Sequence, residues 1–254
     1  MAQRQKWWWL GGLATGLLAA AGWNIYSRRS LERIPSVEGL EDPDVAQAYG
    51  WVARTPQMRL ARYFVARRAA EMMPEGIAAD LGCGPGLLAI ELARQAAGLR
   101  VVGVDVAPEM LTQGQELARQ SGVEEHVSFR LGDVAQLPFP DASLDLVIST
   151  FSLHHWSEPV PVLDEMARVL RPGGAFLVVD LRRDMVPPAY LLLWFAQHVV
   201  VPAALRYLGE PLGSRNAAYT LDEAAALAEQ SRLRSWRVTA GPLWLTIEGV
   251  QEDD

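Results

Sequence analysis

An acidic residue and three glycines at positions 80–86 are the first group in the chain whose types and spacing could do chemistry. The stretch reads Asp80-Leu-Gly-Cys-Gly-Pro-Gly86 and lies where a strand-like apolar run gives way to a helix-like one. Glycines at such a junction permit a tight turn and a close approach of the backbone to a ligand, with a helix N-terminus beyond. Asp105 ends the next strand-like run, where a carboxylate can accept hydrogen bonds from ribose hydroxyls. These residues predict a site for a nucleotide-like ligand.

Two features distinguish this loop from a dinucleotide-binding loop. The dinucleotide fingerprint requires a third small residue at position 87, and this chain has Leu87. Asp80 places a negative charge before the loop, where a pyrophosphate gains nothing from it but a ligand with an ammonium group does. We therefore expect a ligand that carries an ammonium group.

Five motifs that follow one another in order resemble the class I S-adenosylmethionine-dependent methyltransferases. The resemblance covers about Ala79 to Asp180 and is strongest to the branch that contains ubiquinone- and menaquinone-biosynthesis and related small-molecule methyltransferases. The motifs are Asp80-Leu-Gly-Cys-Gly-Pro-Gly86, Gly103-Val-Asp105, Gly132-Asp-Val-Ala-Gln-Leu-Pro-Phe139, Leu144-Asp-Leu-Val-Ile-Ser-Thr150 and Arg168-Val-Leu-Arg-Pro-Gly-Gly174.

This resemblance implies S-adenosylmethionine as the cofactor, without a metal ion. Gly82, Gly84 and Gly86 would pass close to its methionine and ribose portions. Asp80 would help to hold the α-amino group, directly or through water.

The same resemblance assigns the ribose and adenine contacts to residues that follow the second and third strands. Asp105 would bind both ribose hydroxyls, and Val106 would pack on the adenine ring. Asp133 would face the adenine amino group, with Val134 beside it.

The residues after the fourth strand concern the methyl group itself. Thr150 and Phe151 would border the sulfonium. His154 and His155 follow at once and are the candidate general bases, although a pair of histidines here could instead brace the loop. The Asn-Pro-Pro-Tyr tetrapeptide typical of amino-group methyltransferases is absent from this position, which argues against nucleic-acid bases and glutamine side chains as acceptors.

These residues can form one site only if the strands that precede them end side by side. The hydrophobic pattern predicts such strands. Apolar runs without polar alternation, typical of buried parallel strands, alternate with amphipathic helix-like stretches, which predicts a doubly wound α/β sheet. The strand-like runs are 77–81, 101–106, 127–131, 144–150 and 175–181, with two closing strands at 236–240 and 243–250. The helix-like stretches are 87–97, 108–121 and 160–170. Together with the resemblance, this pattern predicts a Rossmann-like, seven-stranded methyltransferase sheet.

The N-terminus carries a different signal. From Trp7 to Trp23 there is no charged side chain, and the run through Tyr26 would span about 30 Å as a helix, which matches the bilayer core. Tryptophan and tyrosine flank both ends, with arginine or lysine beyond them. We expect a retained transmembrane helix rather than a cleaved secretory signal, for which residues 19–21 would offer the cleavage site.

The predicted organisation is an anchor with basic flanks at 1–33, a linker with N-terminal helices at 34–76 and the methyltransferase domain at 77–254. Within the last, residues 187–208 are apolar and are expected to form a helical cap over the substrate pocket after the fifth strand. Beyond this cap, Thr220-Leu-Asp-Glu223 forms a capping box that predicts a helix through Leu233.

Charge and cysteine content restrict the partners and the compartment. The net charge of the chain is −7. Because residues 1–33 have a net charge of +4, the remaining residues are strongly acidic and a poor electrostatic match for nucleic acid. The single cysteine, Cys83, cannot form an internal disulfide. Because S-adenosylmethionine is made in the cytosol, we expect the catalytic domain on the cytoplasmic side of the membrane.

Three functions fit this sequence. The first is a membrane-anchored methyltransferase that acts on a small, lipophilic acceptor. The second is a non-catalytic S-adenosylmethionine-binding scaffold at the membrane, and the third is a protein or peptide methyltransferase.

Overall fold

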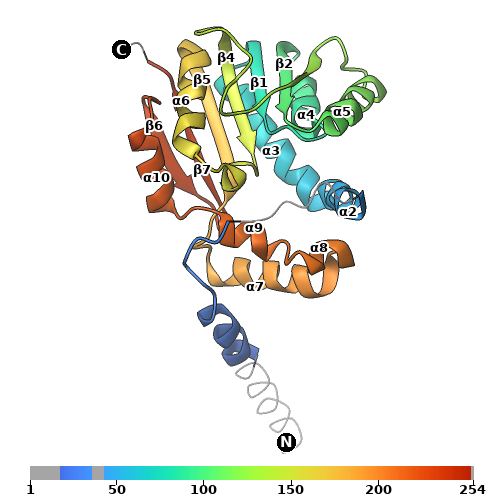
Figure 1. The fold of residues 1–254 in the computed structure, drawn as a ribbon, viewed down its shortest axis with the longest axis vertical. Coiled ribbons are helices and arrows are strands. Elements are labelled where there is room, and N and C mark those ends of the chain that lie inside the picture. Colours follow the sequence, from blue (N-terminus) through green and yellow to red (C-terminus); the bar gives the residue numbers. More distant parts are fainter. Residues whose placement is uncertain (1–17, 36–42, 253–254) are drawn as a thin grey trace, which may run out of the picture.

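A computed structural model describes residues 18–35 and 43–252. Its centre is a seven-stranded sheet with the order β3-β2-β1-β4-β5-β7-β6 (Figure 1). Strands β1 to β5 are parallel, and β7 pairs antiparallel with both β5 and β6. The strands are β1 Glu75–Leu81, β2 Gly98–Asp105, β3 Val127–Leu131, β4 Leu144–Thr150, β5 Leu170–Leu181, β6 Trp236–Ala240 and β7 Trp244–Val250. The predicted seven-stranded, doubly wound α/β sheet is therefore confirmed.

Helices cover both faces of this sheet, which explains why the strands are apolar on both sides. One face packs against α3 Pro56–Met72, α4 Leu87–Gln95 and α5 Pro108–Gln120. The other packs against α6 Pro159–Val169 and α10 Leu221–Gln230. Within β4, Leu146 and Ile148 belong to the first core and Leu144 and Val147 to the second.

Helix boundaries follow local sequence signals. The expected capping box is present, since the Thr220 hydroxyl accepts from the Glu223 amide and the Glu223 carboxylate accepts from the Thr220 amide. Helix α10 ends at Gln230, three residues earlier than expected, because the chain is extended at Ser231. Pro56 divides the predicted N-terminal helical region into α2 Pro43–Ala53 and α3.

The apolar segment after β5 forms a helical cap at the end of the molecule toward which the parallel strands point (Figure 1). It consists of α7 Pro187–Phe195, a π-helical turn η2 at Ala196–Val200 and α8 Ala203–Tyr207. Val201 and Leu205 are buried against Val45 and Ala48 of α2. The short helix α9 Leu212–Ala217 connects the cap to α10.

The predicted membrane segment at residues 7–26 lies largely outside the described residues, which begin at 18. Residues 18–27 are helical and project beyond α7 (Figure 1). Within 18–35 and 43–252, no helix combines the length and the apolar character needed to cross a membrane.

Residues 28–35 have no regular structure beyond a turn, yet they are bound to the domain. The Ile34 amide donates to the Asn216 carbonyl at 3.0 Å. The carbonyl of Leu31 accepts from Arg183 at 2.7 Å, and that of Ser30 accepts from Arg215 at 2.7 Å. Because both arginine side chains are almost fully buried, these carbonyls compensate charges that water does not reach.

Candidate functional site

The glycine loop joins β1 to α4 and has the backbone conformation that only glycine adopts easily. Gly82, Gly84 and Gly86 all have positive φ, at 64°, 51° and 67°. The amides of Gly82 and Cys83 both donate to the Val104 carbonyl of β2, at 2.9 and 3.1 Å. Gly86 is the N-cap of α4, so the loop ends with the amides of a helix N-terminus.

The glycines differ in what surrounds them. A Cβ on Gly82 would lie 2.3 Å from the Ser152 hydroxyl, and one on Gly86 would lie 2.3 Å from the Phe129 ring. A Cβ on Gly84 would meet nothing within 4 Å. Two glycines are therefore required by protein packing, whereas Gly84 borders open space beside Asp105, where a bound nucleoside would lie.

This contrast predicts different outcomes for two matched substitutions. Gly84→Ala should cost about 1 kcal/mol of folding free energy, from the positive φ alone, and should weaken binding of S-adenosylmethionine because the added methyl group enters the ligand's space. Gly82→Ala should destabilise the protein more, because its methyl group collides with Ser152. Thermal unfolding and calorimetric titration of both variants measure this. A Gly84→Ala protein with unchanged cofactor affinity would contradict the assignment.

Asp105 lies at the end of β2 and organises the loop. One carboxylate oxygen accepts from the Gly84 amide at 2.7 Å, and the other accepts from the Ala107 amide at 2.9 Å. These bonds leave further lone pairs on both oxygens for a ligand's hydroxyls. The next side chain, Val106, is 65% exposed, as expected for an apolar surface that an adenine ring covers.

Asp80 is almost fully buried at the end of β1, and one of its oxygens has no hydrogen-bond partner. Burial raises the pKa of this carboxyl to about 8, with a smaller upward contribution from Asp105, while the Ala89 amide opposes the shift. A buried carboxylate without a partner is costly, and an ammonium group would compensate it. This orphaned oxygen fits the amino group of S-adenosylmethionine.

We therefore predict that cofactor binding is linked to a proton at Asp80. The carboxyl is largely protonated in the free protein below pH 8, so its contribution to stability falls as the pH rises from about 4 to about 8. Binding of an ammonium group should ionise it and release a proton, and affinity should rise between pH 6 and 7. Titration calorimetry in buffers of different ionisation enthalpy measures the release. Asp80→Asn serves as the control, and equal proton release by this variant would overturn the assignment.

The predicted adenine and sulfonium contacts lie at the same edge of the sheet. Asp133 is exposed just beyond β3, and its carboxylate accepts from the Ala135 amide at 2.9 Å. Val134 packs against the core instead of projecting freely. Thr150 ends β4, and Phe151 follows with a φ of 53°, a strained conformation for a side chain of this size. The structure thus brings the predicted cofactor residues to the carboxyl ends of β1 to β4.

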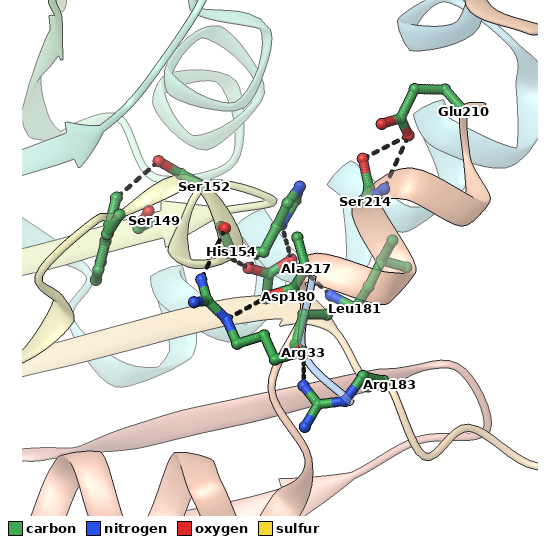
Figure 2. A network of polar contacts seen from close by, with 12 residues as sticks. Arg33, Ser149, Ser152, His154, Asp180, Leu181, Arg183, Glu210, Ser214 and Ala217 are labelled. Atoms are coloured by element: carbon green, nitrogen blue, oxygen red, sulfur yellow. Dashed lines mark hydrogen bonds and ion pairs between the residues drawn. The ribbon is translucent and has the colours of Figure 1, made fainter. Parts of the chain in front are cut away.

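The two histidines lie in the loop after β4, where Leu153–His155 forms a short 3-10 turn, η1. Figure 2 shows His154 beside Asp180. The His154 Nδ1 lies 2.7 Å from one oxygen of Asp180 in β5, and both side chains are buried. Since a carboxylate oxygen accepts, the His154 Nδ1 carries the proton of this bond. The neighbouring His155 ring lies 3.9 Å away, and burial, with His154 next to it, lowers the pKa of His155 to about 4.

Sequence reasoning missed three residues that support this loop. Asp180 accepts from the His154 amide as well as its ring, and from the Leu181 amide. Arg33 donates to the carbonyls of Ala217 and His154, which ties the N-terminal segment to the loop (Figure 2). Ser152 accepts from the Trp156 indole at 3.0 Å. The sequence offered a signal for Asp180, because it is an acidic residue in the otherwise apolar run at 175–181.

Cys83 is not a nucleophile despite its place in the loop. Burial raises the pKa of its thiol far above the usual value, with Asp80 and Asp105 adding to the effect, and the thiol donates to the Gly84 carbonyl.

Comparisons with known proteins agree with this geometry. Residues 79–178 match the model of a methyltransferase domain. The demethylmenaquinone methyltransferase of Deinococcus radiodurans is 31% identical over 185 residues, which cover 69% of this chain and 73% of that protein. The enzyme of the same name from Thermus thermophilus is 32% identical, over 68% of this chain and 76% of that protein.

A solved structure shares the fold at low identity. The S-adenosylmethionine-dependent methyltransferase of Aquifex aeolicus superposes with a TM-score of 0.62, at 18% identity, over 81% of this chain and 97% of its own. With several other curated methyltransferases the match is shorter and spans 36–38% of their length.

Proposed function

The chain belongs to the class I S-adenosylmethionine-dependent methyltransferases, and from this we propose that it methylates a small, lipophilic acceptor at a membrane surface. Its cofactor is S-adenosylmethionine, and its acceptor class is that of small molecules. The lipophilic nature of the acceptor and the attachment to a membrane are the proposal.

The residues described above fit the cofactor. When bound, S-adenosylmethionine supplies an electrophilic methyl group that an in-line nucleophile can take. Asp80 and Asp105 would hold its two polar ends, and the glycine loop would let the backbone approach between them. The protein's contribution is therefore mainly the alignment of the acceptor with the methyl group, which can lower a barrier by roughly 7 kcal/mol or more.

The observation that carries the lipophilic acceptor is the cap. From Met185 to Leu205 the chain has no charged side chain, and this segment begins directly after β5, beyond the edge that holds the cofactor residues. An acceptor that contacts this segment would meet mainly apolar side chains. Demethylmenaquinone, the acceptor in the name of two relatives, is one molecule of this kind.

His154 and His155 are the candidate general bases for an acceptor that must lose a proton. The His154 Nε2 is buried in the structure, so it would reach an acceptor only after a movement of the loop. The Asp180 carboxylate holds its tautomer and stabilises a positive charge on the ring. His155 is a weaker base, since the pKa of its ring is about 4. In an acceptor that needs no deprotonation, the same pair would position the loop.

We also propose that the apolar run at residues 7–26 anchors the enzyme, with the catalytic domain in the cytoplasm, where its cofactor is made. Protease treatment of intact spheroplasts tests this topology. Digestion of the catalytic domain by protease added outside the spheroplasts would exclude a cytoplasmic location of this domain.

The acceptor class is tested by methyl transfer from S-adenosylmethionine labelled in its methyl group to a membrane lipid extract, with Asp105→Ala as the inactive control. We expect S-adenosylhomocysteine to form and the label to enter the organic phase. Label in protein would favour a protein methyltransferase, and cofactor binding without turnover would favour a scaffold. Either result would overturn the proposal.

A further inference from the structure

The cap has its polar and apolar sides reversed relative to an ordinary surface helix. The side chain of Gln197 points inward and accepts from the Leu212 amide at 3.0 Å, while the next residue, His198, is exposed. Large apolar side chains face outward, and along α7 and η2 they are spaced three or four residues apart, about one helical turn. They are Leu192, Phe195, Val199, Val200 and Tyr207, exposed by 62%, 49%, 58%, 52% and 93%. We call these five residues the apolar face of the cap.

The N-terminal helix ties this face to the predicted anchor. Tyr26 packs edge-on against Tyr190 of α7 with ring centroids 5.7 Å apart, and Gly22 lies against Leu191. Ile25 and Tyr26 share a hydrophobic cluster with Met185. The described part of the apolar run, residues 18–26, therefore lies beside α7, and α7 and α8 lie across that end of the molecule (Figure 1).

The charges around the face suit an anionic surface. The segments 18–31 and 185–209 contain three arginines, Arg28, Arg29 and Arg206, and no carboxylate, although the chain as a whole has a net charge of −7. Of the acids that adjoin these segments, Asp184 pairs with Arg182 and Glu210 is buried, whereas Glu32 is exposed. Arginines at the rim of an apolar face are typical of elements that lie in the interface of a bilayer with anionic lipids.

The cap is too short to cross a bilayer. Helix α7 and η2 form a continuous helical stretch of 14 residues, about 21 Å long, against an apolar core of about 30 Å, and the chain turns at Pro202. An element of this length with an apolar outer face can lie in the interface without crossing it.

We propose that the apolar face of the cap docks into the lipid interface, so that the enzyme touches the bilayer at two places, the anchor and the cap. This inference rests on the proposed membrane-tethered function and deepens it. The cap would then form a path by which a lipophilic acceptor passes from the bilayer into the site without crossing water.

The test uses the full chain with the anchor disabled by Leu13→Arg and Leu17→Arg, mixed with vesicles of phosphatidylcholine and phosphatidylglycerol. We expect this protein to be extractable with carbonate, unlike the unmodified chain, and still to float with the vesicles. Adding Val199→Asp and Val200→Asp should lower the bound fraction about tenfold or more, because the binding scales with buried apolar area.

The matched control adds Leu60→Asp and Phe64→Asp instead, on α3, where the two side chains are exposed to a similar extent, 58% and 55%. This variant should bind vesicles as before. An anchor-disabled chain that does not float would overturn the docking of the cap and leave the anchor proposal intact. Carbonate extraction of the unmodified chain would instead overturn the anchor.

Sedimentation of the same proteins without lipid distinguishes a second copy of the chain as the occupant. We expect no change in mass on adding Val199→Asp and Val200→Asp. A dimer that these substitutions dissociate would overturn the docking to lipid.

Discussion

Asp105→Ala is expected to weaken S-adenosylmethionine binding about 100-fold, or roughly 3 kcal/mol. The carboxylate would accept two ribose hydroxyls, and hydrogen bonds to a charged group are among the stronger ones in proteins. The same carboxylate holds the Gly84 and Ala107 amides, so its removal also releases the loop that shapes the site. Calorimetric titration of the purified variant measures the loss.

Asp105→Asn is the matched variant, because it keeps one acceptor oxygen while it removes the charge and replaces the other acceptor by an NH2 donor. Its affinity should lie between those of the alanine variant and the unmodified protein. Unchanged affinity in a folded Asp105→Ala protein would show that the ribose binds elsewhere, and tighter binding of NAD than of S-adenosylmethionine would argue against the cofactor itself.

Asp180→Ala should lower the free energy of unfolding by about 3–5 kcal/mol. Asp180 is 1% exposed and accepts three hydrogen bonds, from the His154 amide, the His154 ring and the Leu181 amide. Without the carboxylate these donors are buried and have lost their acceptor. Urea denaturation followed by circular dichroism measures the change.

Asp141→Ala is the control for this substitution, since Asp141 is 80% exposed where it pairs with Arg168. Exposed pairs contribute less than about 1 kcal/mol, so this variant should be nearly as stable as the unmodified protein. If Asp180→Ala does not fold, Asp180→Asn gives the comparison, because its amide keeps one acceptor. A loss below 1 kcal/mol for both Asp180 variants would mean that the pair with His154 does not stabilise the loop.

The sequence predicted the strands well where the signal is local. The bounds of β3 and β4 agree with the expected ones. In β3 apolar and polar residues alternate, and β4 is mostly apolar, so each segment carries its own strand signal. Strand β1 begins at Glu75, two residues earlier than expected. Glu75 and Gly76 are not apolar, but they belong to the strand because they pair with Gly98 and Leu99 of β2. Strand pairing is a property of two segments, so one segment's composition does not reveal it.

The supports of the site were harder to predict because they join distant segments. Asp180 and His154 are 26 residues apart and meet because β4 and β5 are neighbours in the sheet. Arg183 reaches the Leu31 carbonyl across 152 residues. No periodicity links such pairs, and a backbone carbonyl as the partner of an arginine cannot be recognised from residue types. The carboxylate that pairs with Arg183, Glu223, is itself 40 residues away.

The crystal structure of the complex with S-adenosylhomocysteine is the most direct test of the central claim, that the loop between β1 and α4 holds this cofactor. We expect both ribose hydroxyls within hydrogen-bond distance of Asp105, the amino group at the buried oxygen of Asp80, and the adenine ring against Val106 with Asp133 at its edge. A ligand bound away from Asp105, or with its amino group turned from Asp80, would contradict the assignment of the site.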